Sequence, residues 1–167
     1  MRIRREAASD HAAIRAVNNA AFETPVEADI VEELRSNGVR LDSLVADVDG
    51  AIVGHALFSP AVLAAHPQLK IMGLGPMSVV PDQQRKGIGS ALVREGLKRC
   101  KELGYLAVIV IGHPQYYPRF GFVPAVRYRM RSQYDVPEDA FMVAELEAGA
   151  LQGASGLVRY DEAFGSV

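Results

Sequence analysis

Apolar and polar positions in the first 40 residues predict an edge strand followed by two helices. The residues from Arg2 to Glu6 alternate weakly between polar and apolar, as half-buried strands do. Ser9 and Asp10 are residue types that cap helices, and the apolar residues after them repeat at helical spacing. One helical face is thereby predicted to carry Ile14, Val17, Ala21 and Phe22.

The second helix has a more complete start signal. Thr24 is a capping residue, Pro25 suits the first helical position, and Glu27 completes a capping box with Thr24. Asn37-Gly38 is a typical helix end, so we expect the helix to stop there.

A hairpin follows the two helices. Leu44 to Val48 and Ala51 to Phe58 are strand-like, and Asp49-Gly50 between them favours the positive φ angles of a type I′ turn. The two strands should therefore pair antiparallel.

The next apolar segment, Ile71 to Val80, has breaks within it. It comes after a polar link around His66-Pro67, and Gly73, Gly75 and Pro76 interrupt it. Glycine weakens a strand ladder and proline removes a donor, so we expect a bulged or splayed strand.

The clearest helix runs from Gly87 to Leu103, and Gly104 ends it. Its apolar face carries Ile88, Leu92, Val93, Leu97, Cys100 and Leu103. Tyr105 to Ile111 is a continuous apolar run, typical of a strand buried on both faces. Strand, helix and strand then form a crossover that should be parallel and right-handed. Beyond Phe122 the pattern predicts short strands around Val126 and over Phe141 to Leu146, and a loose Gly/Ala/Ser tail.

Composition narrows the class of protein. The 167 residues, 49% hydrophobic and 23% charged, suffice for one globular domain over 1–167 with a sizeable core. A formal net charge of −2 gives no broad positive field, so nucleic acid is not expected as a partner. Cys100 is the single cysteine and no zinc-spaced cluster accompanies it, which predicts a reducing compartment and no metal. No export signal and no run of about 18 apolar residues is present, so we expect a cytoplasmic protein without membrane association.

The segment from Val79 to Ser90 carries the most chemical information. A buried strand ends there, and a glycine-bearing turn opens the amphipathic helix. The first N–H groups of a helix have no internal partner, and the aligned peptide dipoles add about half a positive charge. Gly87 and Gly89 let a phosphate approach the backbone, and Arg85 and Lys86 add charge, so a pyrophosphate would suit this turn.

Other interpretations of the two glycines stay open at this point. Gly87 and Gly89 could simply allow the helix to pack closely on the sheet. The segment lacks the third glycine of a dinucleotide fingerprint and the Gly-Lys-Ser/Thr ending of a nucleotide P-loop, which disfavours both of those sites.

Two motifs in this order resemble the GNAT superfamily of N-acetyltransferases. Gln84 to Gly89 matches the family signature of Gln or Arg, two residues, Gly, one residue, and Gly or Ala, and the Val79 to Asp82 lead-in is also similar. Tyr116 to Phe122 resembles the family's tyrosine, three residues, Gly-Phe ending. The resemblance covers the whole chain, and its ending over Phe141 to Leu146 and Gly156 to Tyr160 is similar to one bacterial subgroup of predicted acetyltransferases.

The resemblance implies an α/β fold with a mixed, mostly antiparallel, splayed sheet of six or seven strands and helices on both faces. It implies acetyl-CoA as co-substrate, with its pantetheine arm along the backbone of Met77, Ser78 and Val79. The arm would lie where the sheet splays between the Ile71 to Val80 strand and the Tyr105 to Ile111 strand. Either the Met77 or the Ser78 N–H would donate to the thioester carbonyl and stabilise the oxyanion by about 3 kcal/mol. The pyrophosphate would lie on the backbone of Arg85, Lys86, Gly87, Ile88, Gly89 and Ser90.

Tyr117 stands at the family's general-acid position, four residues before Gly121. There a phenol would protonate the departing thiolate of coenzyme A. A packing role with the hydroxyl at the surface is the alternative for Tyr117, and a structural role is expected for Tyr116.

The general base is not evident, because the family's common glutamate near the start of the Tyr105 to Ile111 strand and its asparagine after that strand are both absent. His113 could accept a proton or contact the cofactor, or be a turn residue. His55 could face an acceptor cleft or be a hydrogen-bonded sheet residue. A water chain is a further route.

Several other residues have more than one possible role. Asn18, Asn19 and Glu23 could line an acceptor pocket or form a solvated face. Glu27 is assigned to the capping box, and Cys100 to inert core.

The resemblance thus predicts an acetyl-CoA-dependent N-acetyltransferase in which a small-molecule or peptide amine attacks the thioester directly. An acyl-CoA-binding sensor or regulatory module without catalysis is the alternative, and a nucleotide-binding protein is a third. The acceptor, the use of other acyl groups and the oligomeric state, including a homodimer, stay open.

Overall fold

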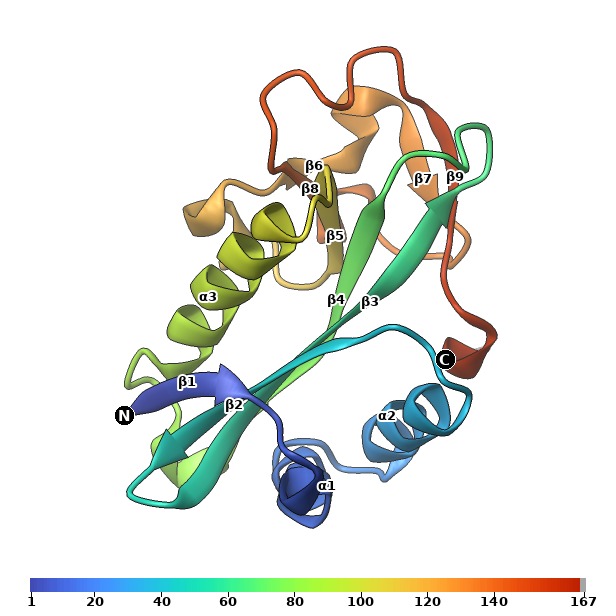
Figure 1. Cartoon of the computed structure of the whole chain (residues 1–167). Coiled ribbons are helices and arrows are strands. Elements are labelled where there is room, and N and C mark those ends of the chain that lie inside the picture. Colours follow the sequence, from blue (N-terminus) through green and yellow to red (C-terminus); the bar gives the residue numbers. More distant parts are fainter. Residues whose placement is uncertain (166–167) are drawn as a thin grey trace. The chain divides into compact units, whose positions relative to one another are not determined.

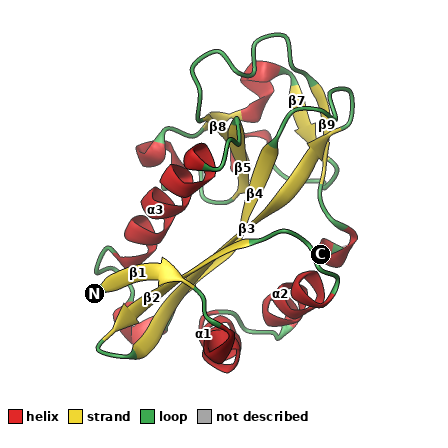
Figure 2. Ribbon diagram, in the orientation of Figure 1, coloured by secondary structure: helices red, strands yellow, loops and turns green. Residues whose placement is uncertain are grey.

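Nine strands and three α-helices account for most of the regular structure in residues 1–165, the part of the chain that this computed structural model describes (Figures 1 and 2). The helices are α1 (His11–Ala21), α2 (Val26–Ser36) and α3 (Ile88–Glu102). The strands are β1 (Arg2–Arg5), β2 (Asp42–Val48), β3 (Ala51–Leu63), β4 (Ile71–Val79), β5 (Ala107–Ile111), β6 (Val123–Pro124), β7 (Met130–Ser132), β8 (Phe141–Glu145) and β9 (Gly156–Arg159). Short 3₁₀ turns connect several of them.

The strands are hydrogen-bonded in the order β1-β2-β3-β4-β5-β8-β6, and β9 pairs with both β3 and β7. β4 with β5 and β7 with β9 are parallel, whereas β1 with β2, β2 with β3 and β5 with β8 are antiparallel. This confirms the mixed, mostly antiparallel sheet. The strands outnumber the six or seven expected because β6 and β7, of two and three residues, are too short to show an alternating pattern.

The chain divides into two compact units. The first comprises Met1–Phe58 and Gly75–Gly96, and the second comprises Ser59–Leu74 and the chain from Leu97 onward. β3, β4 and α3 each contribute residues to both units. A single domain over 1–167 stays a prediction, and its last two residues lie outside the described part of the chain.

Within the first unit, helices cover both faces of the strands. A Cβ added at Gly54 would lie 3.1 Å from side-chain carbons of Ile88 and Leu92 in α3. The next residue along β3, His55, lies 3.2 Å from Asn18 of α1 through its Nδ1 atom. Because successive strand residues point to opposite faces, α3 and α1 lie on opposite faces of this strand, as expected.

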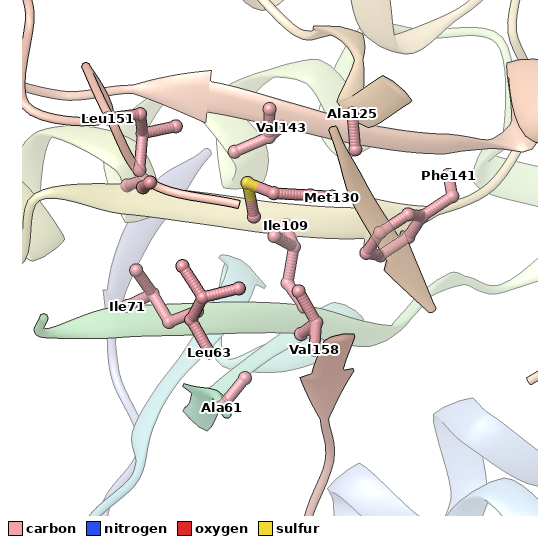
Figure 3. Close-up of a cluster of buried hydrophobic side chains, with 12 residues drawn as sticks. Ala61, Leu63, Ile71, Ile109, Ala125, Met130, Phe141, Val143, Leu151 and Val158 are labelled. Atoms are coloured by element: carbon pink, nitrogen blue, oxygen red, sulfur yellow. The ribbon is translucent and has the colours of Figure 1, made fainter. Parts of the chain in front are cut away.

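The second unit is built around an apolar core (Figure 3). Figure 3 shows Met130 near Ile109 and Val143, with aliphatic side chains from several strands around them. The cluster consists of Ala61, Leu63, Ile71, Ala107, Ile109, Ala125, Met130, Phe141, Val143, Leu151, Ala154 and Val158. Each of these residues has less than 9% of its surface exposed, so the unit has a densely packed interior.

Local signals placed the hairpin and the crossover correctly. Asp49 and Gly50 have φ angles of 52° and 88°, and they join the antiparallel strands β2 and β3. The ladder between β4 and β5 is parallel and ends at Leu74 paired with Val110, immediately before Gly75 and Pro76. The expected interruption of this strand therefore coincides with the end of its parallel pairing.

Both predicted helix caps differ in detail from the structure. Thr24 Oγ1 is 3.5 Å from Glu27 Oε2, and Pro25 is the N-cap of α2 with no side-chain cap bond, so the capping box is not formed. The Asp10 carboxylate accepts a bond from the Ala7 N–H at 2.7 Å instead of capping α1. At α1 the departure arises because the chain enters the helix through the 3₁₀ turn Ala8–Asp10, which engages the Asp10 carboxylate.

Three further expectations for the chain were wrong. Val126 lies in a 3₁₀ turn, Ala125–Tyr128, and not in a strand. The Gly/Ala/Ser tail contains β9, whose pairing with β7 and β3 the local sequence does not reveal. Leu103, placed on the apolar face of its helix, is 50% exposed because α3 ends at Glu102.

Candidate functional site

The turn before α3 has the geometry that an anion site requires. Gln84 anchors it, since Nε2 donates to the Val79 carbonyl at 2.9 Å. Arg85 and Gly87 have φ angles of 64° and 84°, in the left-handed region that a non-glycine residue seldom adopts. Both residues are exposed, so the strained turn presents its backbone to solvent.

The first turn of α3 adds the helix dipole to this loop. Ala91 N donates to the Gly87 carbonyl at 3.0 Å, so the amides of Ile88 and Gly89 precede the helical ladder. The exposed side chain of Lys86 reaches Gln83 Oε1 at 3.4 Å and adds positive charge beside them. The predicted segment from Arg85 to Ser90 therefore forms one helix start, in which Arg85, Lys86 and Gly87 are exposed, Gly89 and Ser90 are partly exposed, and the Ile88 side chain is buried.

The end of β4 supplies the other predicted cofactor-binding residues. Ser78 and Val79 are 3% and 9% exposed, and Met77 is half-buried. The Ser78 hydroxyl donates to Asn18 Oδ1 of α1 at 2.9 Å. Ser78 thus points its side chain into the first unit, and this part of the strand is tied to a helix.

That hydrogen bond belongs to a buried polar network. Asn18 Nδ2 donates to the Ile14 carbonyl at 3.1 Å and lies 3.2 Å from His55 Nδ1. His55 Nε2 lies 2.9 Å from Ser43 Oγ. Burial lowers the pKa of His55 to about 4, with Glu6 opposing and Arg35 adding to that shift. His55 is therefore neutral at physiological pH.

Glu6 ends the network near the surface. Its carboxylate is hydrogen-bonded by Ser43, accepts bonds from Arg35 at 3.0 Å, and lies 2.8 Å from His11 Nε2. Burial opposes its ionisation, but the bonds from Ser43 and Arg35 outweigh burial, so the pKa of Glu6 lies below its ordinary value. The first unit thus holds a chain of hydrogen bonds from a surface carboxylate to β4.

The network decides between the alternatives left open for several residues. His55 is fully buried and is a hydrogen-bonded sheet residue. Asn18 is fully buried, so it is not part of a solvated face, whereas Asn19 and Glu23 are exposed. Cys100 is buried in the interior, as expected of a structural thiol.

Tyr117, from the second unit, begins the 3₁₀ turn Tyr117–Phe120. The residue is 8% exposed, and its ring packs edge-on against Phe122 with a centroid distance of 5.6 Å. A Cβ at Gly112 would lie 2.4 Å from Tyr117 Cε2, so the ring rests directly on the glycine backbone. Burial, with a smaller contribution from Tyr116, raises the pKa of Tyr117 to about 12 and keeps the phenol protonated at neutral pH.

The neighbours of Tyr117 have structural roles. Tyr116 contacts the rings of Tyr117 and Phe120, and Arg119 lies 4.6 Å above its ring. The His113 carbonyl accepts bonds from the amides of Tyr116 and Tyr117 at 3.1 and 3.4 Å, which fits its interpretation as a turn residue.

Sequence reasoning missed Ser43 and Glu6 and did not connect Asn18 with Ser78. Ser43 lies just before the apolar run Leu44 to Val48 that predicts the strand, and it is 5% exposed. A small hydroxyl residue at a buried strand position is a weak signal, because only the fold reveals its partners.

Two features are absent from residues 1–165. No group of three or more His, Cys, Asp or Glu side chains in this range could hold a metal ion. No helix in the same range is both long and apolar enough to cross a membrane.

Comparison with known proteins gives a consistent result. Residues 2–125 match the family model of the acetyltransferase (GNAT) domain. The chain is 38% identical to the uncharacterised N-acetyltransferase YhbS of Escherichia coli K12 over 98% of both proteins.

Two solved structures are similar over nearly the whole chain. YhbS from Escherichia coli in complex with CoA has a TM-score of 0.94 at 37% identity, covering 98% of this chain and 91% of that one. A GNAT-family acetyltransferase from Brucella melitensis in complex with acetyl-CoA has a TM-score of 0.81 at 34% identity, covering 98% and 97%. The strand order, the helix-start turn and these likenesses agree, and the chain belongs to the GNAT acetyltransferase family.

Proposed function

We propose that this protein binds acetyl-CoA at the start of α3 and along the end of β4, and transfers the acetyl group to an amine. The observation that carries the proposal is the turn from Arg85 to Ser90, whose first three residues are exposed, with its left-handed residues and its amides at a helix start. The complexes of similar proteins with CoA and acetyl-CoA support the choice of ligand.

Each chain segment has a defined part in the proposed binding. The backbone from Arg85 to Ser90 holds the pyrophosphate, with Arg85 and Lys86 adding charge. Met77, Ser78 and Val79 bond the pantetheine amides as a neighbouring strand would. A backbone N–H at Met77 or Ser78 donates to the thioester carbonyl oxygen and stabilises the charge that develops there.

The transfer itself needs one bond formed and one broken. The nitrogen of a neutral amine attacks the thioester carbon, the carbon–sulfur bond breaks, and the nitrogen loses a proton to water. Tyr117 gives its hydroxyl proton to the departing thiolate and regains one from solvent. The hydroxyl carries its proton throughout the physiological range, as a general acid must.

Binding is tested by the acetyl-CoA-dependent shift in melting temperature. Gly89→Val should abolish the shift, because the added side chain occupies the space of the phosphate. Arg85→Ala should weaken binding only several-fold, since backbone groups make most of the contact. A Gly89→Val variant that binds acetyl-CoA like the parent would show that the phosphate site is elsewhere.

Catalysis is tested by turnover of acetyl-CoA on a panel of amines, with binding followed separately. Tyr117→Phe removes one hydroxyl and almost no volume, so kcat should fall by about 10² to 10⁴ with little change in the acetyl-CoA dissociation constant. Tyr116→Phe is the matched control, because its ring is a structural neighbour, and it should cost far less.

The same experiment judges the alternative, a CoA-binding regulatory module. β5 carries only apolar residues where a catalytic carboxylate could have stood, which favours that alternative. Near-parental turnover in Tyr117→Phe, or an equal loss in both variants, would remove Tyr117 from the mechanism. Tight acetyl-CoA binding without turnover of any amine would favour the regulatory module.

A further inference from the structure

We propose that Asn18, His55 and Ser43 form a buried positioning relay that fixes the Ser78 side chain, and with it the β4 backbone that receives the thioester. The inference rests on the proposed function, because it concerns the strand assigned there to the thioester. It gives a role to a histidine and an asparagine that the transfer mechanism leaves unused.

The relay is isolated from solvent. Asn18 and His55 are 0% exposed, Ser78 is 3% exposed and Ser43 is 5% exposed. Its links are short: 2.9 Å from Ser78 to Asn18, 3.2 Å from Asn18 to His55, and 2.9 Å from His55 to Ser43. Hydrogen bonds in such an interior are strong, and each group would be costly to leave without a partner.

The direction of every bond follows from the two ends. Asn18 Oδ1 accepts from Ser78, and one Nδ2 proton goes to the Ile14 carbonyl. A flipped amide would place its oxygen against that carbonyl oxygen, so the orientation is fixed.

The second Nδ2 proton of Asn18 faces His55 Nδ1, which therefore accepts. His55 Nε2 must then carry the ring proton and donate to Ser43 Oγ, and the Ser43 hydroxyl donates to Glu6. The Ile14 carbonyl, through the fixed amide of Asn18, thus sets the tautomer of His55 and the direction of the links from Ser78 to Ser43. The Glu6 carboxylate, which Arg35 anchors, is a suitable acceptor at the far end.

This arrangement excludes His55 as the general base. Its Nδ1 lone pair accepts from Asn18 and its Nε2 proton is given to Ser43, so neither nitrogen is available to an incoming amine. His55 is a positioning residue, which acts on the site only through Asn18 and Ser78.

The relay controls the direction of the β4 backbone groups. Residues alternate across a strand, so anchoring the Ser78 side chain to α1 directs Met77 and Val79 to the other face. The N–H groups at Met77 and Ser78 then lie in a fixed direction. Donors to an oxyanion stabilise it well only when they are aligned before the reaction, so loss of the relay should lower kcat more than it weakens binding.

The decisive variant is Ser78→Ala, which removes one hydroxyl and leaves the phosphate turn intact. We expect kcat to fall about tenfold or more, with the acetyl-CoA dissociation constant changed by less than about threefold. Ser78→Thr keeps a hydroxyl and should restore most of the rate. Val17→Ala is the matched control: Val17 is buried on the same helix and its loss destabilises the fold, but kcat should stay close to that of the parent.

Two measurements judge the relay independently of turnover. The ¹⁵N NMR chemical shifts of the His55 ring nitrogens should report the Nε2–H tautomer in the parent. The variant Asn18→Leu should change these chemical shifts. Amide hydrogen exchange at Met77 to Val79 in the acetyl-CoA complex should be at least tenfold faster in Ser78→Ala than in the parent or in Val17→Ala.

Each outcome of these measurements decides a stated point. An Nδ1–H tautomer, or unchanged kcat and amide exchange in Ser78→Ala, would overturn the relay. If the parent acetylates no amine, the proposed function fails. The chemical shifts of His55 and the amide exchange rates at Met77 to Val79 still decide whether the relay exists.

Discussion

The two units of this molecule differ in what they bury. Six residues of the first unit are buried polar or charged side chains, namely Asp10, Asn18, Asp42, Ser43, His55 and Ser78. In the described part of the second unit the corresponding set is Ser59 alone, and the interior is a cluster of twelve apolar residues. The candidate cofactor-binding residues belong to the polar unit and Tyr117 to the apolar one.

The contrast shows two ways of making a rigid interior. Apolar packing gives most of the free energy of folding but little direction, because dispersion contacts have no preferred orientation. Hydrogen-bonded polar groups give little net free energy, yet they fix angles and tautomers. A strand that must direct backbone N–H groups at a ligand is therefore held in place better by hydrogen-bonded polar groups than by apolar packing alone.

The largest effect on stability is expected in the apolar core. Phe141→Ala should lower the free energy of unfolding by about 3–5 kcal/mol, because the large side chain is 4% exposed and its loss leaves a cavity. Urea unfolding measures it. Val126→Ala, at a residue 48% exposed, is the control and should stay within about 0.5 kcal/mol. A loss below about 1 kcal/mol for Phe141→Ala would contradict a packed second core.

Gly96→Ala tests whether the polar unit is packed as closely. A Cβ at residue 96 would lie 2.1 Å from ring carbons of Phe58, which is fully buried. The clash should outweigh the helix propensity of alanine and lower the free energy of unfolding, measured with urea, by about 2–3 kcal/mol. Combining it with Phe58→Leu should recover part of the loss, since the two changes share one contact. A stabilised Gly96→Ala variant would show a loose interior.

The buried histidine of the polar unit should make stability depend on pH between 7 and 5. Burial lowers the pKa of His55 from 6.5 to about 4, so between these pH values the imidazole binds a proton in the unfolded chain but stays neutral in the folded protein. The contribution of His55 to the free energy of unfolding is therefore largest above pH 6.5, and it declines as the pH falls towards 4. The free energy of unfolding should fall by about 2 kcal/mol between pH 7 and pH 5.

The variant His55→Gln should lose that share of the pH dependence, as measured by urea unfolding at both pH values. The lowered pKa values of Glu6 and Asp10 affect stability only below their ordinary values of 4.5 and 3.8, outside this window. An identical pH dependence in parent and variant would show that His55 is not held neutral by burial.

The smallest effect is expected at Thr24. Its side chain does not cap α2, since the helix begins after Pro25 and the hydroxyl only approaches Glu27 at 3.5 Å. Thr24→Ala should therefore change the free energy of unfolding, measured with urea, by less than about 0.5 kcal/mol. A loss of about 1 kcal/mol is the usual cost of removing a cap, and it would show that Thr24 caps the helix as the sequence predicts.

The sequence was informative wherever the physics is local. The Asp49-Gly50 turn and the glycine-bearing start of α3 follow from neighbouring residues, and the β4-α3-β5 crossover follows from three consecutive elements. All three are present in the structure. Tyr117 was identified from a short motif, and its role in catalysis stays a prediction. The strand β9 was not foreseen, because its pairing joins residues that are far apart in the chain.

Tertiary structure alone decided what His55 and Asn18 do. From the sequence, His55 could have faced an acceptor cleft or been a hydrogen-bonded sheet residue, and Asn18 could have lined an acceptor pocket or belonged to a solvated face. Their partners lie 12, 37 and 60 residues away along the chain. The hydrophobic periodicity of the sequence does not predict contacts between residues so far apart. A hydrogen bond depends on angstrom-scale position and direction, and these are defined only when the helix and the three strands have packed together.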